Sequence, residues 1–115
     1  MYEIKDLTIK LTRGDSFYTQ IGMTTDDGQP YVPEEGDSLR FVMKSAKIVG
    51  GEYVDEEPVL EKSIPTDTLV LTLAPADTSD LPFGRYVYDI ELTFASGDVD
   101  TFINNESFFL EPEVD

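Results

Sequence analysis

The residues of this sequence that could most readily do chemistry are carboxylates. Several carboxylates on a loop can bind calcium, and a pair about 5–10 Å apart can hydrolyse glycosides. They gather in four clusters, Asp26/Asp27, Glu34/Glu35/Asp37, Asp55/Glu56/Glu57 and Asp98/Asp100. None has the Asp-x-[Asp/Asn]-x-[Asp/Asn]-Gly spacing of a calcium loop, and a chain this short has little room for a catalytic cleft. We therefore interpret the clusters as solvated turns, with calcium held between loops as the alternative.

Two residue types that carry much enzyme chemistry are absent from the sequence. Histidine is missing, which removes the commonest general base and metal ligand. Cysteine is missing too, which excludes disulfides, thiolate metal sites and cysteine nucleophiles. We expect no catalytic residues, no bound cofactor or metal, and no enzymatic activity.

The charge balance is strongly acidic, with 24 acidic against 8 basic residues and a net charge of −16. Such a surface repels phosphate backbones and anionic lipids, so we expect neither nucleic acid nor a membrane as partner. No apolar run has the length of a transmembrane helix, and the first residues, MYEIKDLTIK, lack the apolar core of a signal peptide.

The elements that position all these side chains are predicted by an apolar period of two, which is typical of strands. Alternation is clear or partial in the segments 7–12, 17–24, 39–44, 47–54, 59–64, 68–73, 86–94, 99–103 and 108–110. The segment 74–81 allows one short helical turn. A switch of parity after Asn104-Asn105 predicts a β-bulge. We therefore predict one domain over residues 1–115, an all-β, immunoglobulin-like antiparallel β-sandwich of seven to eight strands.

One spacing favours the immunoglobulin arrangement in particular. Leu81, Gly84 and Tyr86 follow the pattern Leu-x-x-Gly-x-Tyr at the start of strand F, where the tyrosine hydroxyl bonds to backbone upstream. An ordinary turn before a buried aromatic is the alternative.

Candidate contact residues are those that the strand pattern places outside the core. Clustered tyrosine and phenylalanine side chains mark interfaces. The possible partner surface consists of Tyr18, Tyr31, Tyr53, Phe83, Asp89, Phe102 and Phe109. Asp89 lies in mid-strand, and we expect it to face solvent, a partner, or a base such as Arg40 or Lys44 across the sheet. The tripeptide Arg13-Gly14-Asp15 matches an integrin motif, but a turn between two strands explains it fully.

Five stretches together resemble a known family. They are 11–17 (LTRGDSF), 36–41 (GDSLRF), 73–90 (LAPADTSDLPFGRYVYDI), 97–102 (GDVDTF) and 108–114 (FFLEPEV). They look like small immunoglobulin-like proteins of phages and prophages of Firmicutes, similar to the N-terminal domain of phage baseplate upper proteins. The likeness covers nearly the whole chain, apart from residues 46–58.

The resemblance implies a non-enzymatic structural or accessory virion protein that mediates attachment in a tail, baseplate or capsid decoration. Its partners would then be other phage structural proteins or further copies of this chain. It would be found in the virion, or in the bacterial cytoplasm before assembly. A bacterial surface or carbohydrate-binding sandwich is the alternative, although the sequence lacks tryptophan and a signal segment.

Overall fold

The computed structural model describes the backbone of residues 2–5, 8–23, 27–46, 48–53 and 57–112. Side chains are described for residues 8–23, 27–46, 49–52, 57–101, 103 and 106–112. The first five strands are β1 (Tyr2–Lys5), β2 (Thr8–Thr12), β3 (Phe17–Gln20), β4 (Ser38–Ser45) and β5 (Ile48–Val49). They are followed by β6 (Glu52–Tyr53), β7 (Pro58–Ile64), β8 (Val70–Leu73), helix α1 (Pro75–Thr78), β9 (Gly84–Thr93) and β10 (Val99–Glu111).

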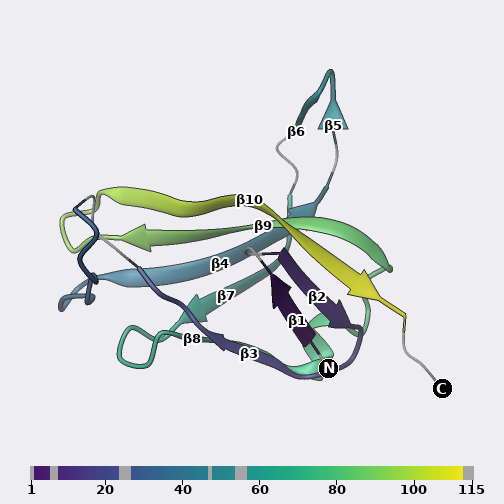
Figure 1. Ribbon diagram of the computed structural model, residues 1–115, viewed down its shortest axis with the longest axis horizontal. Coiled ribbons are helices and arrows are strands. Elements are labelled where there is room, and N and C mark those ends of the chain that lie inside the picture. The colour runs from purple at the N-terminus through teal and green to yellow at the C-terminus, as the bar shows by residue number, and fades with distance from the viewer. Residues whose placement is uncertain (1, 6–7, 24–26, 47, 54–56, 113–115) are drawn as a thin grey trace.

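These strands form an all-β sandwich of two unequal sheets (Figure 1). One sheet has six strands in the order β1-β2-β10-β9-β4-β7, and the other is the pair β3-β8. The pair β3-β8 opposite β4-β9-β10 matches strands B and E opposite C, F and G of an immunoglobulin domain. The predicted fold class is therefore confirmed, with eight strands of the described chain in the two sheets.

One pairing differs from the predicted antiparallel arrangement. Strand β2 runs parallel to β10, with Ile9 opposite Phe108 and Leu11 opposite Leu110. The alternating pattern could not reveal this, because it specifies which face of a strand is buried and not the direction of its neighbour.

The core lies between the sheets, and in β9 the alternation predicted its residues correctly. Tyr86, Tyr88, Ile90 and Leu92 of β9 are all buried. Tyr88 packs against Phe41 of β4, with ring centroids 5.5 Å apart, and edge-on against Phe108 of β10. Because these rings come from three neighbouring strands, they hold the centre of the large sheet together. Burial raises the pKa of Tyr88 to about 12.

The predicted tyrosine corner is present. The Tyr86 hydroxyl donates a 2.6 Å hydrogen bond to the Pro82 carbonyl oxygen. The predicted helical turn, α1, precedes this corner. Asp77 fixes the first turn of α1, because its Oδ2 accepts a 2.7 Å bond from the Ala74 N–H. The buried Thr78 hydroxyl accepts a bond from the Gly14 N–H and so ties α1 to the turn between β2 and β3.

The predicted bulge is confirmed in β10. The register with β9 shifts between Ile103 and Glu106, on either side of the Asn pair, and again between Thr101 and Ile103.

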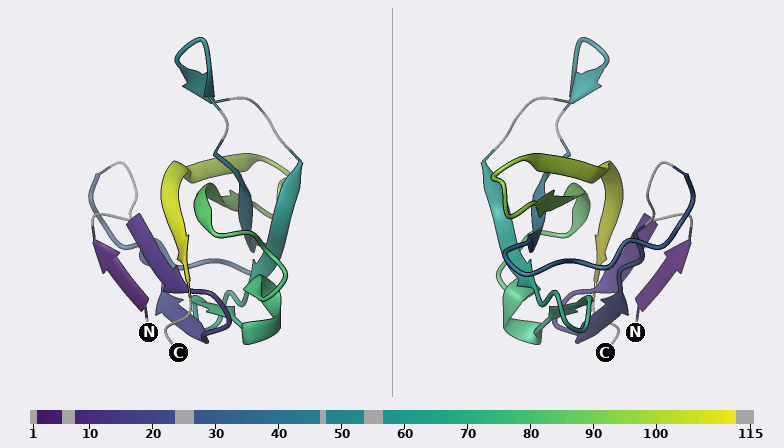
Figure 2. Two further views of the ribbon diagram at one scale, coloured as in Figure 1. Left: turned by 90° about the vertical axis from the view of Figure 1, so that its right-hand side faces the viewer. Right: turned by 90° about the vertical axis from the view of Figure 1, so that its left-hand side faces the viewer.

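Of residues 47–54, expected as an edge strand, the described part 48–53 joins neither sheet. Strands β5 and β6 pair with each other in a hairpin that turns at Gly50 and Gly51, both with positive φ. Two consecutive glycines favour a tight turn with positive φ. The sequence pattern treated this stretch as one continuous strand and did not identify the turn within it. Figures 1 and 2 show this hairpin standing clear of the sandwich.

Candidate interaction surface

The predicted contact residues do not gather on one face. Tyr18 lies on the small sheet and is 61% exposed, whereas Asp89 and Phe109 lie on the outer face of the large sheet. Phe83 lies in the loop before β9 and Tyr31 in the loop before β4. The side chains of Tyr53 and Phe102 lie outside the described residues. The five side chains that can be placed therefore do not form one continuous surface.

Tyr31 is a part of the fold rather than of a free surface. Its ring is half-buried and meets Phe94 edge-on, with centroids 6.0 Å apart. Its hydroxyl donates a 2.6 Å hydrogen bond to Asp37 Oδ2. This bond to a carboxylate raises the pKa of Tyr31 to about 12 and lowers that of Asp37. The parity argument placed Tyr31 outside because it extended a strand pattern through a loop that contains Pro30 and Pro33.

Phe83 is also engaged within the chain. The Arg13 guanidinium stacks over the Phe83 ring at 3.9 Å from its centroid and donates a 3.3 Å bond to the Leu81 carbonyl oxygen. The Arg13 backbone N–H donates to the Glu111 carbonyl oxygen. The Asp15 N–H donates to the Thr12 carbonyl oxygen and so closes a turn. The integrin-like tripeptide is thus a turn whose arginine joins three segments, as the turn interpretation expected.

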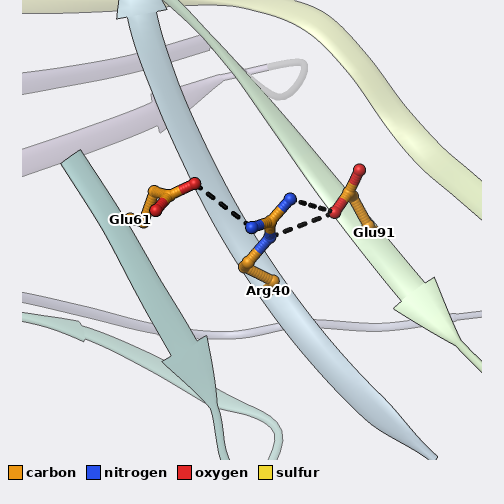
Figure 3. Close-up of polar contacts among 3 residues, drawn as sticks. All are labelled: Arg40, Glu61 and Glu91. Atoms are coloured by element: carbon orange, nitrogen blue, oxygen red, sulfur yellow. Dashed lines mark hydrogen bonds and ion pairs between the residues drawn. The ribbon is translucent and has the colours of Figure 1, made fainter. Parts of the chain in front are cut away.

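On the outer face of the large sheet, acidic and basic side chains form a ladder across strands (Figure 3). Arg40 of β4 donates bonds of 2.8 and 3.1 Å to Glu91 of β9 and one of 3.2 Å to Glu61 of β7. Asp89 is opposite Val42 in the register of β4 and β9. Arg40, one of the two bases expected opposite Asp89, therefore bonds to Glu91 and Glu61 instead of Asp89.

Phe109 lies on the same outer face, with a basic residue opposite it on each neighbouring strand. In register it lies between Lys10 of β2 and Arg85 of β9. Its ring is half-buried, and the methylene stems of long basic side chains can cover such a ring.

A cavity that the sequence did not reveal opens beside β3. It has a volume of about 120 Å³ and is mostly apolar. Its lining comes from both sheets and consists of Ile9, Thr19, Gln20, Ile21, Gly22, Leu71, Tyr88, Ile90 and Ile103. Four consecutive residues, 19–22, belong to β3 and its continuation, so the cavity lies along that strand. It follows from the inequality of the sheets, because β2 and β10 extend the large sheet where the small sheet has no further described strand.

The strand edges differ in how they are protected. Unpaired edges attract further strands, and proteins blunt them with proline, lysine and inward-pointing charge. Edge strand β7 begins with Pro58 and carries Lys62, whose Nζ lies 3.1 Å from Asp77 Oδ2. The stretch 17–23 (FYTQIGM) has neither charge nor proline. In a chain with 28% charged residues, that uncharged stretch is the sequence signal that could have pointed to this edge.

The acidic clusters show no metal-binding arrangement in the part of the chain that can be described. There, no three or more Asp, Glu, His or Cys side chains meet in a way that could hold a metal ion. Asp26, Asp55 and Glu56 lie outside the described residues. Within the described chain, no helix is long and apolar enough to cross a membrane.

Comparisons with known proteins found no matching family model, no matching curated protein and no matching solved structure.

Proposed function

We propose that this protein is a non-enzymatic structural or accessory virion component of a phage or prophage, which attaches to other virion proteins in a tail, baseplate or capsid decoration. The resemblance to small immunoglobulin-like phage proteins motivates the assignment. The contacts of the matching residues support it, since Arg13, Asp77 and Tyr86 all make bonds that build the fold. These residues stabilise the sandwich. We expect attachment to depend on segments outside this common framework.

The observation that carries the proposal is the β5–β6 hairpin. It occupies residues 48–53, within the tract 46–58 that has no counterpart in the family pattern, and it projects from the sandwich (Figure 2). The Cα radius of gyration is 14.8 Å, against about 13 Å for a compact chain of this length. The molecule is thus more extended than a compact chain of this length, and the hairpin is one of the segments that extend beyond the sandwich (Figure 1).

Such a hairpin gains most from contact with another protein. Two short strands without a packed face are marginally stable in water. Val49 in the hairpin is 61% exposed, so it offers apolar surface that a neighbour could cover. An arm of this kind on a rigid sandwich is suited to joining subunits of an assembly.

The test is mass spectrometry of particles purified after prophage induction in the source bacterium. The protein should appear in stoichiometric ratio to the major tail or capsid proteins, which must be detected in the same sample. Its absence from particles rich in those proteins would overturn the proposal.

A matched variant tests the arm itself. Residues 46–57 are replaced by a short Gly-Ser turn, which can join β4 to β7 because Lys44 and Pro58 are opposite in register. The variant should melt like the wild type yet be lost from the particles. Normal incorporation of a folded variant would show that the arm is not the attachment element.

A further inference from the structure

The exposed edge of β3 combines two properties of a peptide-binding site. The first is a set of backbone groups that point away from the sheet. The Ile21 N–H donates a 2.7 Å bond to the Leu69 carbonyl oxygen, so Ile21 and every second residue before it face β8. In an antiparallel pair the alternate residues direct their N–H and C=O groups to the other side. Gln20 and Gly22 therefore present theirs to the edge, where no described strand pairs with β3.

The second property is the apolar cavity next to these groups. Ile21 and Leu71 of the small sheet and Ile9 and Ile103 of the large sheet contribute to its wall. A cavity of about 150 Å³ lined by such side chains can hold a benzene molecule. The present volume of about 120 Å³ thus suits one aliphatic side chain.

The outward backbone groups and the cavity are placed so that one added strand could use both. Gln20 is exposed and Ile21 is buried, so the pleat at this edge alternates between solvent and cavity. A strand placed alongside would bond to Gln20 and Gly22 and direct alternate side chains inward, one of them into the cavity. Strand addition gains affinity from the backbone and specificity from such pockets.

The net charge of the chain favours a basic segment of another protein over a second copy of this chain as the added strand. The chain carries a net charge of −16, so a second copy would be repelled, whereas a basic segment would be attracted. The segment 17–23 adds no lysine to repel such a partner. We propose that the β3 edge binds an extended, basic segment of another protein by strand addition, with one aliphatic side chain of that segment in the cavity. This site is separate from the β5–β6 hairpin and does not depend on the virion role.

The first test is an NMR titration of the whole chain with a short peptide of alternating lysine and valine. We expect saturable amide shifts at Gln20, Ile21 and Gly22 and at the cavity wall. A glutamate–valine peptide of the same length should bind on the order of tenfold more weakly. Absence of saturable shifts at these amides up to millimolar peptide, or equal binding of the acidic peptide, would overturn the proposal.

Two N-methylated peptides test the backbone bonds. One peptide carries a methyl group on the backbone nitrogen of every lysine, and the other carries one on the backbone nitrogen of every valine. Only one set of N–H groups can point to β3, the lysine set if the added strand is antiparallel and the valine set if it is parallel. Loss of binding with one peptide and retention with the other is expected. Retention or loss with both would exclude strand addition.

A matched pair of variants locates the site. Gln20→Pro removes an N–H that faces the edge rather than β8, which is a place where strands tolerate proline. It should abolish peptide binding, whereas Gln20→Ala should retain it. If Gln20→Pro does not fold, the N-methylated peptides still decide the question. Shifts at Gln20 and Gly22 that depend on protein concentration without peptide would identify a second copy as the occupant and overturn the proposal.

Discussion

The Tyr86 hydroxyl and the Pro82 carbonyl oxygen are 2.6 Å apart, and this bond fixes the loop that leads from α1 into β9. Burial of the Tyr86 ring raises its pKa, so the hydroxyl stays protonated and able to donate far above neutral pH. Tyr86→Phe removes the donor and leaves the carbonyl without this partner. We expect a loss of about 1–2 kcal/mol in the free energy of unfolding, measured by urea denaturation. Tyr18→Phe, on an exposed side chain, should change it by less than about 0.5 kcal/mol. An equal effect of both changes would show that the corner contributes nothing to stability.

Tyr88 is the aromatic ring that joins the three central strands of the large sheet. Tyr88→Ala removes the contacts with Phe41 and Phe108 and leaves a cavity in the core. The expected cost is about 3–5 kcal/mol. The control is Tyr18→Ala, which deletes a side chain that is 61% exposed and should cost far less. An unchanged melting temperature for Tyr88→Ala would mean that the two faces of β9 are inverted.

Asp37 joins the loop before β4 to the turn after β9, because its carboxylate accepts bonds from the Tyr31 hydroxyl, the Glu34 N–H and the Ala95 N–H. The hydrogen bond from Tyr31 lowers the pKa of Asp37 below its ordinary value of 3.8. Its contribution to stability is therefore present above pH 3.8 and is lost as the pH falls through the lower, folded-state pKa. Urea midpoints of the wild type and Asp37→Asn should differ at neutral pH and converge in acid. A difference that stays constant down to the lowest pH would contradict this role.

Tyr31 should have the opposite pH dependence. Its hydrogen bond to Asp37 raises its pKa from 10.0 to about 12. The stabilisation is complete below pH 10, where the unfolded tyrosine is protonated, and it is lost as the pH rises toward 12. In alkaline unfolding, wild type should lose stability over this window more steeply than Tyr31→Phe, which has no titrating hydroxyl. Parallel curves for the two proteins would show that the bond does not form.

The extent to which sequence predicted structure differs between strands and loops. In β9, the alternation placed Tyr86 and Tyr88 in the core correctly, because a buried face imposes a period of two. In the loop before β4 the same parity failed for Tyr31, because a chain with prolines and turns has no fixed period. The cavity beside Ile21 was not predictable from its own residues. It depends on which strands lie next to β3, and local alternation carries no information about the neighbours of a strand.

Gly36 and Gly28 provide a matched pair for separating backbone strain from steric overlap. Both have positive φ, 94° and 83°, so alanine at either position should cost about 1–2 kcal/mol for the left-handed conformation. At Gly28 an added Cβ meets nothing within 4 Å, whereas at Gly36 it would lie 2.8 Å from the Ala95 Cβ. Gly36→Ala must therefore also displace the turn after β9, which Asp37 binds through the Ala95 N–H. We expect Gly36→Ala to lower the unfolding free energy clearly more than Gly28→Ala. The double variant Gly36→Ala with Ala95→Gly should recover the difference, because it removes the overlapping methyl group. Failure of that rescue would assign the whole cost to the backbone at Gly36.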